Sequence, residues 1–291
     1  MMQSLIKQLE LLAPSEGYNQ TFINGVGIYK SSESAQRTPL CYSQGIIFVL
    51  QGQKRVFFDE RIYTYNPDNY LVLTVPLPAE CETQLTNNNP LLSLIIDFDM
   101  SVLGELVRVF DEHGKLNGSD KKSNAKGLFV SENTDALSCT LTRLVDCLGS
   151  KLQSDIIGKG LVREVFYHVL QGPQASPLFD LVSHNTHMSK MERTLKHLHN
   201  HYDDKLDVEQ LASMANMSAS TFHRNFKQIT ASSPIQYVKK LRLSKARDLL
   251  QDQGIKVKQA AAQVGYESAT QFSREFTRYF GISPSDYAKA N

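Results

Sequence analysis

The 291-residue sequence lacks long hydrophobic runs. Its uninterrupted apolar stretches fall well short of the roughly 18 residues that a transmembrane helix needs. Residues 1–13 have the pattern of a short amphipathic helix that is interrupted by Lys7 and Glu10, and they lack the apolar core of a signal peptide. The sequence therefore predicts a cytoplasmic protein with no membrane contact.

Residue patterns that hold metals or disulfides are also missing. The four cysteines show no CxxC or CxxH spacing, so neither a zinc site nor a disulfide framework is expected. His197, His199 and His201 are two apart on a predicted helix, and side chains at that spacing cannot all face one ion. We predict no metal site and no cofactor.

The two parts of the chain carry net charges of opposite sign. From Ser189 to the end there are 16 Lys and Arg against 10 Asp and Glu, a net charge of +6. The preceding residues have 15 against 20, a net charge of −5. A basic C-terminal part beside an acidic N-terminal part suits the binding of a polyanion at one end of the molecule.

Short apolar runs separated by turn residues occupy residues 22–98. Gln51–Gln53 predicts a hairpin between two runs, and Asn66–Asn69 predicts a second turn. Strands of this length and spacing are typical of an antiparallel sandwich or small barrel. The predicted strands are Val26–Tyr29, Gly45–Leu50, Arg55–Phe58, Ile62–Tyr65, Tyr70–Val75 and Leu92–Phe98.

Helical periodicity replaces the strand pattern after Met100, over Val102–Phe110, Thr134–Leu148 and Asp155–Leu170. An apolar stripe on the middle helix packs either against a second copy of the chain or against its own barrel; it consists of Leu137, Leu141, Leu144, Val145 and Leu148. The aperiodic segment 173–188 is the predicted linker. The predicted domains are therefore 1–172 and 189–291.

An internal repeat occupies the last hundred residues. Val208–Asn216 aligns with Val257–Gly265 at an offset of 49, and the offset then becomes 50 for Phe222, Arg224, Phe226, Pro234 and Tyr237 against Phe272, Arg274, Phe276, Pro284 and Tyr287. Each copy is a short apolar helix, a turn and an amphipathic helix. The repeat predicts two helix-turn-helix units, at 208–229 and 257–280.

The turns and helix starts of both copies carry suitable residues. Asn216 and Gly265 tolerate the positive φ that a short turn between steeply crossing helices needs. Ser218 and Ser268 stand where an N-cap hydroxyl accepts a hydrogen bond from the following helix. The same start signal, with proline in the first turn, recurs at Ser233-Pro234 and Ser283-Pro284.

The second helix of each unit has a polar face opposite its phenylalanines. Arg donates two hydrogen bonds to guanine, and Ser, Thr and His bind bases or phosphates. The predicted DNA-binding residues are Ser218, Ser220, Thr221, His223, Arg224 and Lys227 in the first unit, and Ser268, Ala269, Thr270, Ser273 and Arg274 in the second. A repeat scaffold without DNA-binding activity is the competing interpretation.

A helix over Pro234–Gln251 is predicted between the units, about 27 Å long at 1.5 Å per residue. A rod of this length would hold the two second helices near the roughly 34 Å of one duplex turn. Its polar face is basic and carries Lys239, Lys240, Arg242, Lys245 and Arg247.

Residues 191–291 resemble the DNA-binding domain of AraC/XylS-type regulators, most specifically over Ala261–Pro284, AAQVGYESATQFSREFTRYFGISP. The resemblance implies that the DNA-reading positions are Ser220, His223, Arg224, Ala269, Thr270, Ser273 and Arg274. Ala269 is a departure, because it offers only apolar contact, for instance to a thymine methyl group. Residues 51–58 and 63–67 resemble the cupin-like regulatory domain of one branch of this family, which senses small molecules and often mediates dimerisation.

A cupin-like barrel is also compatible with a metal-dependent enzyme, which would need several strand histidines and a carboxylate. The first histidine is His113, which follows the predicted strands, so no enzymatic activity is predicted. Aromatic residues suit a ligand cavity or the core. The candidate ligand-binding residues are Tyr29, Tyr42, Phe48, Phe57 and Tyr65.

The predicted fold is α+β with two domains, a cupin-like antiparallel β-barrel with a helical appendage and an all-α domain with two helix-turn-helix units joined by a linker helix. The predicted function is a sequence-specific transcription regulator, an activator, that binds promoter DNA as a monomer or homodimer, contacts RNA polymerase and responds to a small molecule in its N-terminal domain. Two alternatives stay open, a constitutive DNA binder whose N-terminal domain only oligomerises, and a thiol-based redox or electrophile sensor that uses Cys41 or Cys81.

Overall fold

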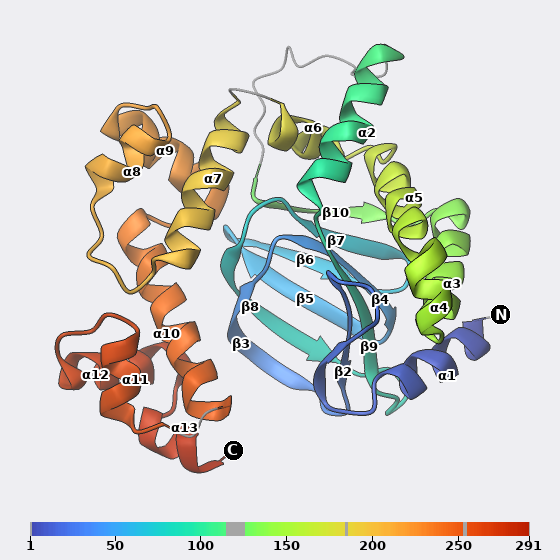
Figure 1. The fold of residues 1–291 in the computed structure, drawn as a ribbon. Coiled ribbons are helices and arrows are strands. Elements are labelled where there is room, and N and C mark those ends of the chain that lie inside the picture. The colour runs from blue at the N-terminus through green and yellow to red at the C-terminus, as the bar shows by residue number, and fades with distance from the viewer. Residues whose placement is uncertain (1, 115–125, 184–185, 253–254, 291) are drawn as a thin grey trace.

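Two antiparallel sheets form the N-terminal part of the computed structural model, which describes residues 2–114, 126–183, 186–252 and 255–290 (Figure 1). The larger sheet has the order β1-β2-β9-β4-β7-β10, and the smaller has the order β3-β8-β5-β6. The strands are β1 (Gly17–Gln20), β2 (Val26–Ser31), β3 (Ala35–Tyr42), β4 (Gly45–Gln51), β5 (Gln53–Phe58), β6 (Arg61–Tyr65), β7 (Asn69–Leu73), β8 (Leu77–Gln84), β9 (Leu91–Asp97) and β10 (Leu128–Glu132).

The predicted hairpin at Gln51–Gln53 is wrong. β4 pairs with β7 and β9, whereas β5 pairs with β6 and β8, so the chain passes here from one sheet to the other. Gly52 has a φ of +87°, and a Cβ atom at this position would meet the Leu91 side chain at 2.9 Å. Glycine therefore allows a sharp change of direction where two strands of a hairpin were expected. The predicted turn at Asn66–Asn69 is present, with the Asn69 amide donating to the Asn66 carbonyl at 3.1 Å.

Strands β3 and β8 do not appear among the predicted strands, because each contains a proline and several polar residues. Pro39 lies on β3, at the edge of the smaller sheet, where the loss of a backbone donor is tolerated. β8 alternates buried and half-buried residues, with Cys81 and Thr83 facing inward. Alternate side chains of β8 therefore face the larger sheet.

Helices cover one side of the larger sheet (Figure 1). The apolar stripe of α3 is almost fully buried and belongs to the same hydrophobic cluster as the strands, so it packs against its own barrel and not against a second copy. α6 lies in the segment expected to be a linker, and its Leu178 and Leu181 are buried. These helices are α1 (Met2–Leu12), α2 (Met100–Glu112), α3 (Asp135–Leu148), α4 (Lys151–Gln153), a π-helical turn η1 (Ser154–Gly158), α5 (Lys159–Leu170) and α6 (Ser176–Val182).

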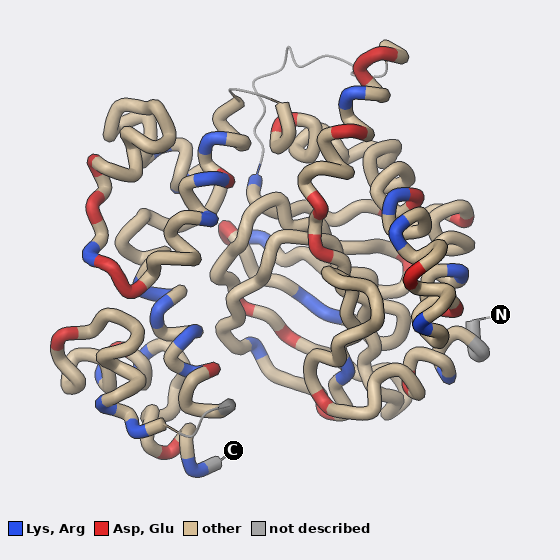
Figure 2. Tube along the Cα trace, in the orientation of Figure 1, with Lys and Arg blue, Asp and Glu red and all other residues tan. Residues whose placement is uncertain are grey.

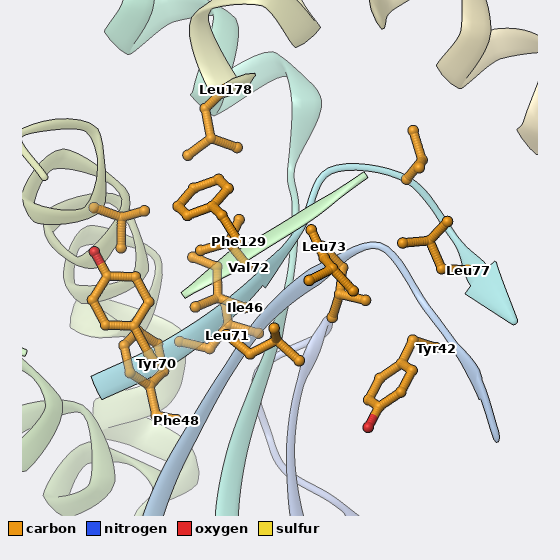
Figure 3. Packing of buried hydrophobic residues seen from close by; sticks show 14 of the residues in the cluster. Tyr42, Ile46, Phe48, Tyr70, Leu71, Val72, Leu73, Leu77, Phe129 and Leu178 are labelled. Carbon is orange, nitrogen blue, oxygen red and sulfur yellow. The ribbon is translucent and has the colours of Figure 1, made fainter. Parts of the chain in front are cut away.

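The core of the N-terminal part lies between the larger sheet and these helices (Figure 3). Ile46 and Val72, which are paired between β4 and β7, are fully buried there. Phe129 of β10 and Leu178 of α6 lie above them in the same view. Burying each such side chain contributes about 1.5–3 kcal/mol to stability.

The C-terminal part is all helical, which confirms the predicted two-domain α+β fold. It consists of α7 (His187–Asn200), α8 (Val208–Met214), α9 (Ala219–Thr230), α10 (Pro234–Asp252), α11 (Val257–Gln263), α12 (Ala269–Phe280) and α13 (Pro284–Ala290). α8 and α9 lie at one end of α10, and α11 and α12 at the other (Figure 1). Among the described helices, none is both long and apolar enough to span a membrane.

Candidate DNA-binding surface and effector pocket

Both helix-turn-helix turns have the positive φ that was predicted, 54° at Asn216 and 78° at Gly265. At Gly265 a Cβ atom would lie 2.4 Å from the Asp203 carbonyl oxygen. Because that neighbour is backbone, it cannot move away as a flexible side chain would. Glycine is therefore required here by sterics as well as by backbone conformation.

The predicted N-cap serines are confirmed. Ser218 Oγ accepts from the Thr221 amide at 3.4 Å, and Ser268 Oγ accepts from the Gln271 amide at 3.2 Å. Each serine thereby satisfies one of the free amides at the start of the second helix of its unit, α9 or α12, which we call the recognition helix. Ser233 and Ser283 do the same for α10 and α13.

In the first unit, α9 separates a buried face from a polar face. Phe222 and Phe226 are fully buried, whereas Ser220, His223, Arg224 and Lys227 are exposed and Thr221 is half-buried. Within the described part of the chain, neither Arg224 nor Lys227 forms an ion pair. Their charges are therefore available to phosphates or base edges.

In the second unit, α12 buries Phe272 and Phe276 and exposes Thr270 and Arg274. Ala269 and Ser273 are half-buried. The Ser273 hydroxyl donates to the Ala269 carbonyl at 2.9 Å, so toward a ligand its oxygen can only accept.

Sequence reasoning missed two exposed residues of α12, Gln271 and Arg278. Together with Arg274 and Glu275 they line one surface hollow. Arg278 lies one helical turn after Arg274, and residues four apart share a helix face. That spacing was the signal that would have added Arg278 to the predicted surface.

Two basic residues of α10 make contacts within the C-terminal part. The Arg242 guanidinium donates to the backbone carbonyls of Tyr202 at 2.6 Å and Gly265 at 3.0 Å. Lys239 Nζ lies 2.8 Å from Glu275 Oε1. Figure 2 shows Lys and Arg gathered along α10, and among them Lys239 and Arg242 connect this helix to neighbouring helical segments.

Several hydrogen bonds join the C-terminal helices to the barrel. The Tyr237 hydroxyl donates to the Pro76 carbonyl at 2.7 Å and lies 2.8 Å from His199 Nε2, and the Gly127 amide donates to the Ile229 carbonyl at 2.9 Å. Because the hydroxyl proton is used on Pro76, His199 must supply the proton of the second bond. Burial lowers the pKa of His199 to about 4, so the ring stays neutral at pH 7.

A pocket with a volume of 580 Å³ lies between the two sheets and extends to the C-terminal helices. Of the predicted ligand residues, Tyr29 and Tyr42 line it. Phe48 instead packs against Tyr70 on the helical side of the sheet, where Figure 3 shows the pair well away from Tyr42. Tyr65 does not line the pocket, but its hydroxyl oxygen lies 3.1 Å from that of Tyr42, and the two hydroxyls form a hydrogen bond.

Phe57 is the remaining predicted ligand residue, and it also lies outside this pocket. It faces out from the smaller sheet, beneath the guanidinium of Arg37 at 4.2 Å. It lines a separate cavity of 360 Å³ between that sheet and the end of α9. Phe48 and Phe57 therefore do not line the pocket between the sheets, and aromatic composition alone does not show which face of a strand a residue occupies.

Two polar residues of the pocket were missed, Lys54 and Ser93. Both are buried, at 7% and 1% exposure. Lys54 alternates with Val56 and Phe58 on the inward face of β5, and that alternation was a signal available in the sequence. Arg247 and Gln251 of α10 and Tyr287 of α13 also line the pocket, so both parts of the chain form it.

The cysteines are all free thiols. Burial raises the pKa of Cys41 to about 12, which disfavours the reactive thiolate. Cys81 is buried on the inward face of β8. Within the described residues, no group of three His, Cys, Asp or Glu side chains is placed to hold a metal ion.

Comparisons with known proteins agree with this geometry. Residues 22–177 match the model of the AraC-type transcriptional regulator N-terminus, and residues 211–290 match that of a helix-turn-helix domain. The transcriptional activator RhaS of Escherichia coli is 35% identical over 98 residues, which are 34% of this chain and 35% of RhaS. The match thus spans about a third of that curated relative.

Solved structures of ToxT from Vibrio cholerae share the fold. One superposes with a TM-score of 0.59 at 16% identity and covers 91% of this chain and 97% of ToxT. A second, which holds a bound unsaturated fatty acid, has a TM-score of 0.57 at 13% identity and covers 94% and 97% of the two chains. The arrangement of barrel and helical units is therefore common to both proteins.

Proposed function

Because the chain belongs to the AraC-type transcriptional regulators, which bind DNA, we propose that it reads promoter DNA with both helix-turn-helix units and activates transcription in response to a small molecule. Under this proposal the regulatory part is 1–172 and the DNA-binding part is 189–291. The protein acts as a monomer or homodimer and contacts RNA polymerase. The similarity to the transcriptional activator RhaS supports activation of transcription.

The observation that carries the proposal is the pair of exposed polar faces at corresponding positions of a duplicated unit. Arg224 and Arg274 are exposed on α9 and α12, each on the face opposite the buried phenylalanines. α10 joins the units and has 19 residues, hence a length of about 28 Å. This length suits two helices that enter successive major grooves on one side of a duplex.

The predicted contact residues follow from these two faces. Ser220, Thr221, His223, Arg224 and Lys227 would act from α9, and Ala269, Thr270, Ser273 and Arg274 from α12, while Ser218 and Ser268 combine capping with phosphate contact. Arg224 and Arg274 carry the largest share, since a bidentate arginine discriminates between bases by about 1–3 kcal/mol.

The pocket between the sheets is the proposed effector site. Its volume suits a small organic molecule, and it borders α10, the helix that joins the two helix-turn-helix units. A protein of this fold, ToxT, has been solved with a bound small molecule, which supports the assignment. An effector acts by binding one placement of the DNA-binding helices better than another.

Operator affinity tests the DNA-binding proposal. Genomic fragments that the purified protein retains define an operator, and fluorescence anisotropy gives its Kd. We expect Arg224→Ala and Arg274→Ala each to weaken binding about tenfold to a hundredfold, equivalent to roughly 1–3 kcal/mol. Arg108→Ala, an exposed arginine of α2 in the N-terminal part, is the matched control and should leave the Kd unchanged. An unaltered Kd in the double variant at 224 and 274 would show that the recognition helices are wrongly assigned.

A further inference from the structure

The effector pocket contains a lysine without an anionic partner. Lys54 is 7% exposed and, among the residues that the structure describes, forms neither a hydrogen bond nor an ion pair. Its Nζ lies 4.7 Å from the centre of the Tyr29 ring, whose π face attracts the ammonium group but does not neutralise its charge. Burial lowers its pKa. A buried ammonium group in this setting is costly unless an anion approaches it.

Ser93 is a second unsatisfied group in the same space. Its side chain is 1% exposed, and its Oγ has no hydrogen-bond partner. Ser93 is paired with Tyr29 across β9 and β2, so its side chain emerges on the same sheet face as the ring beside Lys54. Buried polar groups normally have partners. Two donors left without acceptors in one pocket indicate that a ligand supplies the acceptor atoms.

The remaining lining sets the shape of that ligand. Ile47 and Ile95 of the larger sheet and Leu40 of the smaller sheet give the pocket apolar walls. The Arg247 guanidinium already donates to Asp248 and to the Pro39 carbonyl. The donors that lack acceptors, one ammonium group and one hydroxyl, match a single carboxylate, whereas a phosphate dianion would need more donors. Asp97, at the exposed end of β9, disfavours a second anionic group there.

We propose that the pocket binds a monocarboxylate with an apolar body, whose carboxylate accepts hydrogen bonds from the Lys54 ammonium group and the Ser93 hydroxyl. The inference rests on the proposed effector function of the pocket and specifies its ligand class. Arg247 and Gln251 of α10 close the same pocket. The Arg247 guanidinium donates to the Pro39 carbonyl of β3 at 3.0 Å, so the ligand lies directly beneath the contact between α10 and the barrel.

Thermal shift and calorimetry on the full chain test the ligand class. The probes are octanoate and phenylacetate, each paired with its uncharged counterpart, octan-1-ol or 2-phenylethanol. We expect at least one acid to raise the Tm of the wild type while its alcohol does not. Lys54→Met should weaken acid binding at least tenfold and Ser93→Ala several-fold, whereas Lys7→Met, an exposed lysine of α1, should leave it unchanged.

Three results would overturn the inference, namely no Tm shift with either acid, equal binding of acid and alcohol, or undiminished acid affinity in Lys54→Met. Misfolding of that variant would be visible, because we expect its ligand-free Tm to rise once the unpaired charge is removed. Operator affinity, measured on the same samples, keeps the two proposals separate. Operator binding without acid binding contradicts only the ligand class, and acid binding without operator binding contradicts only the regulator function.

Discussion

The two helix-turn-helix units have similar sequences but different surroundings. The buried residues of the first unit, such as Phe222 and Phe226, belong to the same hydrophobic cluster as the barrel. Those of the second, such as Phe272 and Phe276, form a separate cluster with the end of α10. The first copy is therefore part of the same core as the barrel, while the second is carried on α10 with its own core.

Corresponding tyrosines show the same divergence. Tyr237 is fully buried and bonds the Pro76 carbonyl of the barrel. Tyr287, its counterpart, is half-buried, and its hydroxyl donates to Gln251 within the C-terminal part at 3.2 Å. A repeated sequence thus gives equal local structure but unequal coupling to the regulatory domain.

The largest expected effect comes from core truncation in each unit. Phe226→Ala and Phe276→Ala should each cost about 3–5 kcal/mol. Because only Phe226 shares the barrel core, its loss should accelerate hydrogen exchange in the barrel strands, whereas loss of Phe276 should accelerate exchange only in α11, α12 and α13. Equal exchange in the barrel strands of both variants would contradict the difference between the two cores.

A medium effect is expected from the paired tyrosines. Tyr237→Phe leaves the Pro76 carbonyl and the His199 N–H without their partner, and should lower the free energy of unfolding by about 1–3 kcal/mol. Tyr287→Phe should change it by less than about 0.5 kcal/mol, because its hydroxyl is close to solvent. Urea titration of both variants gives the two values. A similar loss in each would show that burial does not distinguish the tyrosines.

A smaller effect should appear at the helix ends that follow the recognition helices. Ala231 has a φ of 51° after α9, and Gly281 has a φ of 76° after α12. Left-handed backbone costs a non-glycine residue about 1 kcal/mol. Ala231→Gly should therefore stabilise the protein and Gly281→Ala should destabilise it, each by about that amount in urea titration. Opposite signs are the decisive feature, and a loss in both would contradict the explanation.

The smallest effect concerns protonation of His199, which does not change the stability at neutral pH. His199 has a pKa of about 4 when folded, below its ordinary value of 6.5, so the unfolded chain binds the proton more readily. The stability that depends on neutral His199 is complete above pH 6.5 and is lost as the pH falls toward 4. His199→Gln should flatten this part of the pH profile of Tm, whereas exposed His223→Gln should not.

Local requirements made much of the DNA-binding part predictable. The positive φ of Asn216 and Gly265, the serine caps and the buried phenylalanines each depend on residues a few positions away, so the pattern alone determined them. The roles of Arg242 and Arg247 could not be predicted, because their acceptors are backbone carbonyls in distant segments. The basic pattern of the helix face therefore did not show that these arginines make contacts within the protein.

The barrel was harder to predict for the same reason. The sequence pattern located several strands but not their sheet partners, and the two sheets meet at Gly52, where a hairpin was expected. Whether an aromatic side chain faces the pocket or the helices depends on that pairing. The sequence could therefore not show that Tyr42 lines the pocket and Phe48 does not. Lys54 and Ser93 lie in one pocket only because the two sheets face each other.

Methylation-interference footprinting on the selected operator tests most directly whether both units read one duplex. We expect two segments about 10 base pairs apart, on one side of the DNA, in which methylation of guanines in the major groove blocks binding. Arg224→Ala should remove guanine contacts in one segment only, and Arg274→Ala in the other only. Loss of the same segment in both variants, or of neither, would contradict the account.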